Sequence, residues 1–491
     1  MKFLRLFVAV AAVLFAANFS VRAAVKLAAV FGDNMVLQQQ MAVPVWGWAE
    51  PGAQVTVKFA GQEKSTRAAT DGKWLVKLDK LNASFAPQLL TVAAGETNVF
   101  TNILVGEVWL ASGQSNMEKP IGKQPGQKPT LNAAAELAAA NFPNLRVFKV
   151  EKTLAATPQP DLTKFNGWRA CHSNALDGIS FSAAAYFFGR EVHTNLNVPV
   201  GLIESSWGGT RIEPWTPPAG FEQVASQKKF AAPITGTNRL SNTRPLAIYN
   251  AMIAPLTGFA LRGALWYQGE SNLMGTNENN DYREYADKMA ALVGGWRAVW
   301  GEGNFPFYFV QLAPFKYYGA KTQRANSPEQ LAEFWALQAH AAEHIKNTGM
   351  AVTTDLVDNL DDIHPRNKSD VGHRLALLAL ENTYGRKVVS HGPVFRRATF
   401  SGSKAILKFN HTDGGLRSQD GQPLTFFTVA GADGKFVAAA AKIVGDTVEV
   451  SASEIAKPTT VRFAWTETAQ PNFFNGAGLP AEPFRTDDPW R

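Results

Sequence analysis

The sequence predicts an α/β protein in which a parallel sheet carries helices on both faces and has a β-domain at each end. Between residues 106 and 388, short apolar runs alternate with helical patterns, which is typical of a parallel sheet. On either side of this region, short apolar runs are separated by turn residues. The chain has 491 residues, of which 46% are hydrophobic, so two to four domains with apolar cores are expected from length and composition.

Residues 1–23 have the pattern of a secretory signal peptide. Lys2 and Arg5 precede the apolar run 6–17, and small residues follow it up to Ala23. This run is shorter than the ~20 residues that a membrane-spanning helix needs, and no later segment is long and apolar enough. We therefore expect an exported protein, periplasmic or extracellular, with no membrane span.

Residues 24–105 are expected to form a small β-domain resembling a sandwich. Turn residues at 50–52, 70–72 and 82–87 separate short apolar runs. These runs predict strands at 43–48, 53–59, 74–78 and 89–92.

Residues 106–388 are expected to form the α/β domain. The apolar runs predict strands at 108–111, 145–150, 198–203, 261–267, 307–310 and 350–353. The helical patterns cover 182–195, 282–300 and 331–345. Open parallel sheets bind ligands at the carboxyl ends of their strands, so functional residues should follow these strands.

Residues 389–491 return to short strands, with turns at 412–415, 432–434 and 445–446, which predicts a second sandwich-like β-domain. The formal charge of +7 falls to +4 without the signal peptide, and no block of Lys and Arg remains. A nucleic-acid partner is therefore not expected.

Cys171 is the single cysteine, which excludes an intramolecular disulfide and a thiolate zinc cluster. Nothing near it marks an activated nucleophile.

Three segments with polar residues follow predicted strands. In 113–117, Gly113 permits a tight turn that would expose the Ser115 hydroxyl, although a helix cap is the simpler interpretation of a lone serine. In 266–272, the side-chain amides of Gln268 and Asn272 either donate to an oxyanion or close a turn. In 361–365, a carboxylate before His364 either orients the ring or belongs to a capped polar loop.

Together these segments carry a family resemblance. Gly-Gln-Ser-Asn-Met, Trp-Tyr-Gln-Gly-Glu-Ser-Asn and Asp-Ile-His-Pro stand in the order and spacing of the sialate O-acetylesterase family of SGNH-type carbohydrate esterases, which the chain resembles over most of its mature length. The resemblance implies an SGNH-hydrolase-like, flavodoxin-like sheet. It also implies that Ser115 is the nucleophile and His364 the base.

The resemblance further implies an oxyanion hole. Segment 206–210 matches the family's second block, with Gly209 as the expected N–H donor and Gly208 as the alternative. The N–H of Ser115 and the amide of Gln268 would complete the hole, with Asn272 in reserve. For the acid, the reach to His364 favours Asp361, whereas the family's pattern favours Asp362, and a Ser–His dyad without an acid is also open.

The expected reaction is hydrolysis of O-acetyl esters on sugars through an acetyl-serine, with O-acetylated sialic acids as the first substrate class and acetylxylan or another plant polysaccharide as the alternative. A non-catalytic glycan-binding protein is the competing hypothesis, given 13 tryptophans. Trp207 and Arg211, with Glu213 and Trp215, either line the sugar site or pack against a β-domain. No metal or organic cofactor is expected.

One motif points elsewhere. His340 to His344 fits the H-x-x-E-H pattern of inverted zinc peptidases. On a helix, His340 lies opposite the apolar face formed by residues such as Phe334 and Trp335, where a solvated position is expected. A catalytic zinc also needs a third ligand, so we do not expect a zinc site here.

Overall fold

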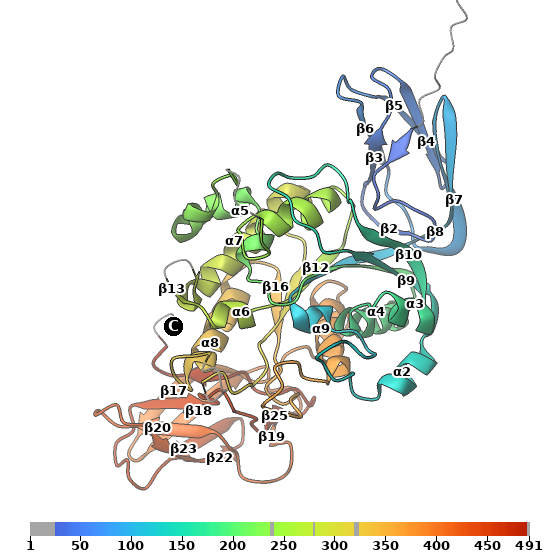
Figure 1. Cartoon of the computed structure of the whole chain (residues 1–491). Helices are drawn as coiled ribbons and strands as arrows, with labels where there is room; N and C mark the ends of the chain where they lie inside the picture. The colour runs from blue at the N-terminus through green and yellow to red at the C-terminus, as the bar shows by residue number, and fades with distance from the viewer. Residues whose placement is uncertain (1–24, 236–239, 278–279, 319–323, 489–491) are drawn as a thin grey trace, which may run out of the picture.

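The computed structural model describes residues 25–235, 240–277, 280–318 and 324–488, so the predicted signal peptide lies outside the described residues. Figure 1 shows a β-region at the N-terminal end, a central α/β region and a β-region at the C-terminal end. This architecture confirms the predicted fold class. Within the described residues, no helix combines the length and apolar character needed to cross a bilayer.

The central sheet has the strand order β10-β9-β11-β8-β12-β15-β16. All neighbours along this path are parallel except β10, which pairs antiparallel with β9 at one edge and was not predicted. The strands are β8 (Glu96–Gly113), β9 (Asn141–Val150), β10 (Phe165–His172), β11 (Val200–Ser206), β12 (Gly263–Tyr267), β15 (Phe307–Val310) and β16 (Thr348–Ala351). Each of the six predicted strands overlaps one of them.

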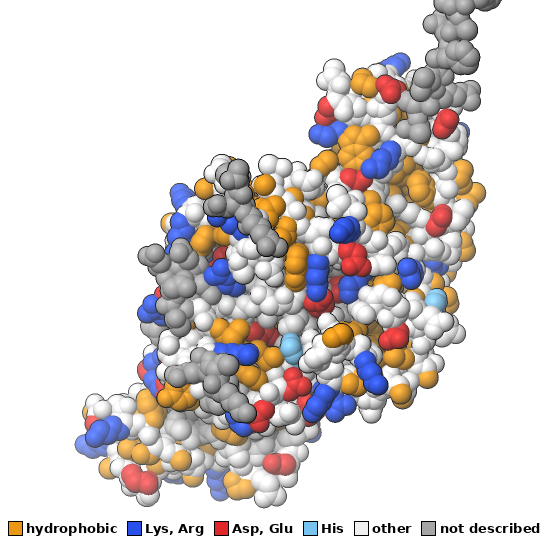
Figure 2. All heavy atoms as spheres, in the orientation of Figure 1, with side chains coloured by type: hydrophobic (Ala, Val, Ile, Leu, Met, Phe, Trp, Pro, Cys, Tyr) orange, Lys and Arg blue, Asp and Glu red, His pale blue; other side chains and the backbone are white. Residues whose placement is uncertain are grey.

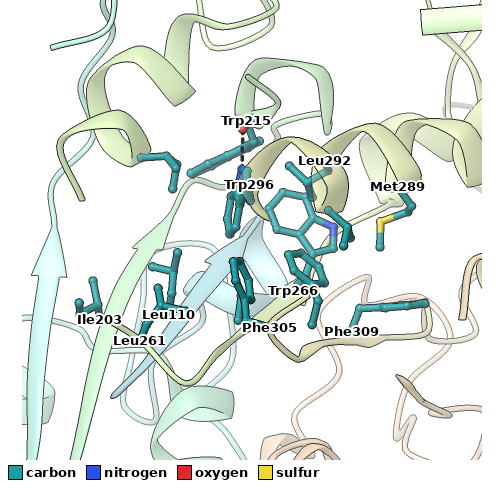
Figure 3. Packing of buried hydrophobic residues seen from close by; sticks show 14 of the residues in the cluster. Leu110, Ile203, Trp215, Leu261, Trp266, Met289, Leu292, Trp296, Phe305 and Phe309 are labelled. Carbon is teal, nitrogen blue, oxygen red and sulfur yellow. Dashed lines mark hydrogen bonds between the residues drawn. The ribbon is translucent and has the colours of Figure 1, made fainter. Parts of the chain in front are cut away.

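Helices cover both faces of this sheet because its strands are apolar on both sides. Along β8, Trp109 and Ala111 pack with residues of α4 (Ala183–Leu196) and α9 (Lys368–Asn382). Val108 and Leu110 point to the other face, whose core includes residues of α7 (Tyr285–Trp300) and α8 (Gln330–His344). Figure 3 shows part of this second core, where the indole of Trp296 donates to the carbonyl of Trp215 at 3.0 Å.

The N-terminal β-region is joined to the central sheet by β8 itself. The first half of this strand pairs with β7 (Ser84–Ala94) and β2 (Val36–Gln38), and its second half lies between β11 and β12. The boundary expected between residues 105 and 106 therefore falls inside one continuous strand. The other strands of this region are β1 (Lys26–Leu27), β3 (Val43–Trp48), β4 (Gln54–Phe59), β5 (Gln62–Arg67) and β6 (Lys73–Leu78).

The C-terminal region contains only antiparallel pairs, in two four-stranded sheets of order β17-β18-β23-β22 and β21-β20-β24-β26 and a small pair β19-β25. Its strands are β17 (Val394–Ser401), β18 (Lys404–Asn410), β19 (Leu416–Ser418), β20 (Phe427–Ala430), β21 (Val437–Ala438), β22 (Ala440–Val444), β23 (Thr447–Ser451), β24 (Thr460–Phe463), β25 (Phe473–Asn475) and β26 (Phe484–Arg485).

The order β11-β8-β12-β15-β16 is the 2-1-3-4-5 arrangement of flavodoxin-like sheets, if β8 is counted first. The switch point lies at β8, between β11 and β12. Short helices begin just after two of these strands, α1 (Ser115–Glu118) after β8 and α6 (Glu270–Leu273) after β12. The remaining short helices are α2 (Ala133–Ala139), α3 (Ser173–Gly178) and α5 (Pro218–Gln223).

Candidate active site

Ser115 and His364 lie together at the carboxyl edge of the sheet, although 249 positions separate them in the sequence. Ser115 Oγ is 2.9 Å from His364 Nε2. The turn that presents Ser115 requires a glycine at 113, since φ is +137° there and a Cβ would lie 2.2 Å from the carbonyl oxygen of Tyr267. A serine hydroxyl in contact with an imidazole is the arrangement of an activated nucleophile.

The structure brings Asp362, and not Asp361, close to His364. Asp362 Oδ1 lies 3.8 Å from His364 Nδ1 and accepts the backbone N–H of His364 at 3.0 Å. The side chain of Asp361 is 70% exposed and pairs with Lys316 Nζ at 3.0 Å. The preference for Asp361, based on reach along the chain, is therefore wrong. The loop turns at Asn359, which holds the backbone N–H groups of both aspartates, and this turn directs Asp361 outward.

The surroundings of His364 favour its neutral form. Burial, followed by the positive charges of Lys368 and Lys119, lowers the pKa of His364 to about 4, while Asp362 acts in the opposite direction. A neutral ring can accept a proton from Ser115 at neutral pH.

The loop after β11 brings Gly208 close to Ser115 and continues with Gly209. A Cβ on Gly208 would lie 3.0 Å from Glu118 Oε2 and 3.2 Å from the Cβ of Ser115, so a larger residue would have to displace one of these side chains. The N–H of Gly208 donates to Glu118 Oε2 at 2.6 Å, and Glu118 also pairs with Lys152. Within the described residues, the N–H groups of Ser115 and Gly209 make no hydrogen bond. These two donors are therefore open to a ligand, whereas that of Gly208 is occupied.

The side-chain amides of Gln268 and Asn272, the predicted third donor and its reserve, already have hydrogen-bond partners within the protein. The amide nitrogen of Gln268 contacts three oxygen acceptors of the protein, on Gln114, Thr210 and Asn272, at 2.8–3.1 Å, and the residue is fully buried. The amide of Asn272 donates to Glu213, and its oxygen accepts the N–H of Ile212. Both side chains are used to hold the loops that follow β11 and β12.

A second set of buried contacts links Ser115 to the histidine loop. Asn116 Nδ2 donates to Glu270 Oε1 at 2.5 Å and to the carbonyl of Ile363, next to His364, at 3.0 Å. Lys368 Nζ donates to Asn116 Oδ1 at 2.7 Å. Burial raises the pKa of Glu270 and lowers the pKa of Lys368 to about 7. We call this set the buried polar layer: Gln114, Asn116, Gln268, Glu270, Asn272 and Lys368, all at most 3% exposed.

The sequence reasoning assigned no role to Asn116, Glu270 or Lys368. Asn116 and Glu270 stand inside the motifs that pointed to the site. Lys368 could have been noticed for a different reason. It is the first residue of α9, where the positive end of the helix dipole disfavours a positively charged side chain. Its position four residues after His364 marks it as a partner of the histidine loop.

The loop after Gly209 has a buried and an open part. Trp215 is buried, and its indole donates to Thr210 Oγ1, so this tryptophan is a packing residue. Glu213 is also nearly buried and pairs with Lys288 at 2.9 Å. Trp207 is half-buried and packs against the core. Arg211 lines a cavity of about 480 Å³ whose other lining residues are Glu213, Lys229, Phe230, Ala232, Pro233, Thr235, Thr243, Arg244 and Pro245.

The two other candidate groups of the sequence lie away from Ser115. The rings of His340 and His344 stack at 4.0 Å on α8, and His344 Nδ1 contacts the carbonyl of His340. His340 is half-buried rather than solvated, because residues of the C-terminal β-region, including Pro483 and Phe484, lie beside it. Among the described residues, no three His, Cys, Asp or Glu side chains form a group that could hold a metal. Cys171 is buried, which raises the pKa of its thiol to about 12.

Comparison with known proteins places this site in a family. The family model described as "Carbohydrate esterase, sialic acid-specific acetylesterase" matches residues 105–381. The human sialate O-acetylesterase is 31% identical over 501 aligned residues, which cover 94% of this chain and 92% of the human one. The orangutan (Pongo abelii) sialate O-acetylesterase shows the same identity and coverage.

A solved structure agrees with this assignment. The crystal structure of a carbohydrate acetylesterase from Xanthomonas citri has a TM-score of 0.84 and 37% identity, covering 94% of this chain and all of the other. Family and fold thus favour an enzyme over a non-catalytic glycan-binding protein, and they imply an acetylated sugar as substrate. The chain belongs to the sialic acid-specific acetylesterase family of carbohydrate esterases.

Proposed function

We propose that this carbohydrate esterase removes O-acetyl groups from sialic acids through an acetyl-serine intermediate. The observation that carries the mechanism is the 2.9 Å contact between Ser115 Oγ and His364 Nε2, and the N–H groups of Ser115 and Gly209 have no hydrogen-bond partner among the described residues. Ser115 is the nucleophile and His364 the base, while Asp362 is the carboxylate that stabilises the imidazolium form.

In the first step, Ser115 Oγ bonds to the acetyl carbonyl carbon as its proton passes to His364 Nε2. The carbonyl oxygen becomes negative and is met by the N–H groups of Ser115 and Gly209, each typically worth ~3 kcal/mol in the transition state. The bond to the sugar oxygen then breaks, and that oxygen takes the proton from His364. Water, deprotonated by His364, attacks the acetyl-serine and releases acetate and the free hydroxyl of Ser115.

The preference for a sialic acid over a neutral sugar rests on charge. Arg211 lies two residues after Gly209 and lines the 480 Å³ cavity together with Arg244 and Lys229. Glu213 also lines this cavity but is paired with Lys288, and Lys229 pairs with Glu284. Arginine binds carboxylates in a fork geometry, which suits the carboxylate that sialic acids carry and xylan backbones lack. The human and orangutan relatives are sialate O-acetylesterases, which supports the same substrate.

Acetate release from O-acetylated N-acetylneuraminic acid and from acetylxylan tests this proposal. We expect faster release from the sialic acid, and loss of that preference in Arg211→Ala with hydrolysis of 4-nitrophenyl acetate retained. Acid-quenched wild-type enzyme should yield an acetylated peptide that contains Ser115. Faster acetate release from acetylxylan would contradict the proposed substrate. An acetylated peptide without Ser115 would contradict the proposed nucleophile.

We also propose that the mature protein is exported, because residues 1–23 have the pattern of a signal peptide. The N-terminal sequence of protein recovered from a cell fraction tests this. A start near residue 24 in the exported fraction supports export, whereas an intact start in the cytoplasm contradicts it.

A further inference from the structure

One face of the sheet β1-β3-β6 carries an apolar row that is only partly buried, in which Trp46 makes an edge contact with Phe31 at 4.8 Å and Trp48 has Lys26 Nζ 5.1 Å from its ring. Residues of β3 alternate between buried and partly exposed, and the partly exposed ones are Pro44, Trp46 and Trp48. Their cross-strand neighbours on β6 are Lys77, Leu75 and Lys73. A solvated sheet face usually carries polar residues, so two tryptophans, a proline and a leucine, which is 48% exposed, are unexpected here.

Residues of this face line a groove that the central domain also lines. The groove has a volume of about 810 Å³, within the range of ligand-binding clefts. The central domain supplies the opposite wall from segments around Pro158–Pro160 and Pro255–Gly258, with Tyr249 and Trp300. Figure 2 shows hydrophobic side chains flanked by Lys and Arg on the N-terminal β-region. The groove is thus built by two domains and is lined by aromatic rings.

The charged residues that line the groove are all positive. Its lining contains Arg67, Lys73 and Lys77 and no Asp or Glu. Lys73 pairs with Asp71 at 3.0 Å, outside the lining, and Arg67 donates to the carbonyl of Gly52. Among the described residues, Lys77 has no ion pair. Aromatic rings between cations fit a ligand that combines apolar faces with negative charges.

We infer that this groove binds an acidic sugar chain at a second site, separate from the acetylesterase site. The C–H face of a sugar ring packs on an indole, and carboxylates along the chain would meet Arg67 and Lys77. The lining of the groove contains none of Ser115, Gly209 and His364, so the two sites share none of these residues. The assignment of a sugar rests on the carbohydrate-esterase family, and not on the Ser115 mechanism.

Binding without turnover provides the test. The full-length Ser115→Ala protein is titrated calorimetrically with a polysialic acid oligomer, with oligogalacturonate and with neutral xylohexaose. We expect both acidic probes to bind, xylohexaose to bind more weakly, and affinity for the acidic probes to fall as salt rises. Trp48→Ala, added to Ser115→Ala, should weaken binding about tenfold.

Matched variants separate a lost contact from a lost fold. Leu75→Ala and Lys77→Ser change exposed side chains of the groove and should each weaken binding without lowering the unfolding temperature. Val99→Ala, an exposed apolar position of the same β-region outside the groove, should leave binding unchanged. The inference is overturned if no probe binds, if xylohexaose binds as well as the acidic chains, or if the groove variants bind like Val99→Ala. Sedimentation showing a dimer that Leu75→Asp disrupts would also overturn it, because a second copy would then occupy the groove.

Discussion

The reacting groups of the site and the buried polar layer next to them use hydrogen bonds in opposite ways. Ser115, His364 and Gly209 have few protein partners, and the N–H groups of Ser115 and Gly209 have none among the described residues. In the buried polar layer, by contrast, a single amide such as that of Gln268 has three acceptors. An N–H group without an acceptor in the protein can donate to the negative charge that develops on a substrate. An N–H group that already has acceptors in the protein can only stabilise the positions of those residues.

This difference separates residues that carry chemistry from residues that position them. Asn116 is a positioning residue, because it lies in the helix of Ser115 and its side-chain amide donates to the carbonyl of the residue before His364. Buried polar groups that lose a partner are costly, so such a layer fixes the distance between nucleophile and base. The comparison predicts that changes to the reacting groups abolish turnover, while changes around them alter its rate or its pH dependence.

The largest effects are expected at the nucleophile and the base. In the proposed mechanism, Ser115→Ala removes the attacking oxygen and His364→Ala the proton acceptor, so each should lower kcat by up to ~10⁶-fold. The double variant should be little worse than either single one, because the two groups act as a unit. Release of acetate, measured with unchanged far-ultraviolet circular dichroism, checks this. Turnover of Ser115→Ala near the wild-type rate would show that another group is the nucleophile.

Asp362→Asn should have the next largest effect. The carboxylate lies 3.8 Å from the ring without a direct bond to it, so its proposed stabilisation of the imidazolium should be modest, and we expect a loss of about 10²-fold in kcat, at the low end for acid–base groups. Loss of its negative charge should also lower the pKa of His364 further. A pH profile of kcat/KM measures both effects. An unchanged rate would indicate a Ser–His dyad.

The apolar runs predicted the strands of the central sheet, because they are local signals. The meeting of Ser115 with His364 was implied by the family resemblance, since each motif alone also allowed a cap or a polar loop. The sequence did not predict β10, whose residues are mostly polar or half-exposed and whose pairing with β9 is irregular. Nor did it show that Gln268 is occupied, since its partner Thr210 lies 58 residues away. The choice between Asp361 and Asp362 depended on a turn at Asn359 that spacing alone does not specify.

Lys368 links the two regions, and its charge should shift the pH profile. It lowers the pKa of His364 because a neighbouring cation disfavours the imidazolium, and below pH 7 Lys368 is itself mostly protonated. Activity should therefore persist below the ~6.5 of a free histidine and fall only as the ring is protonated. Lys368→Gln keeps a donor for Asn116 but removes the charge, so the acid limb of kcat/KM should move up by roughly one pH unit.

Lys368→Met is the control for this shift, because it removes both the charge and the hydrogen bond to Asn116. It should show the same shift in the acid limb and a lower plateau of kcat. An acid limb that stays in place in Lys368→Gln, or moves to lower pH, would contradict the assigned effect of the charge.

Asp361→Asn should have the smallest effect, although Asp361 is next to Asp362 in the sequence. Its carboxylate is exposed and pairs with Lys316 at the surface, and such pairs contribute at most about 1 kcal/mol to stability. We expect kcat to change less than about twofold, and the pH profile to keep its position, since Asp361 is not among the groups that shift the pKa of His364. Asp362→Asn, assayed in parallel, is the matched control. A loss in Asp361→Asn as large as that in Asp362→Asn would mean that the histidine loop rearranges when substrate binds and brings the first carboxylate to the ring.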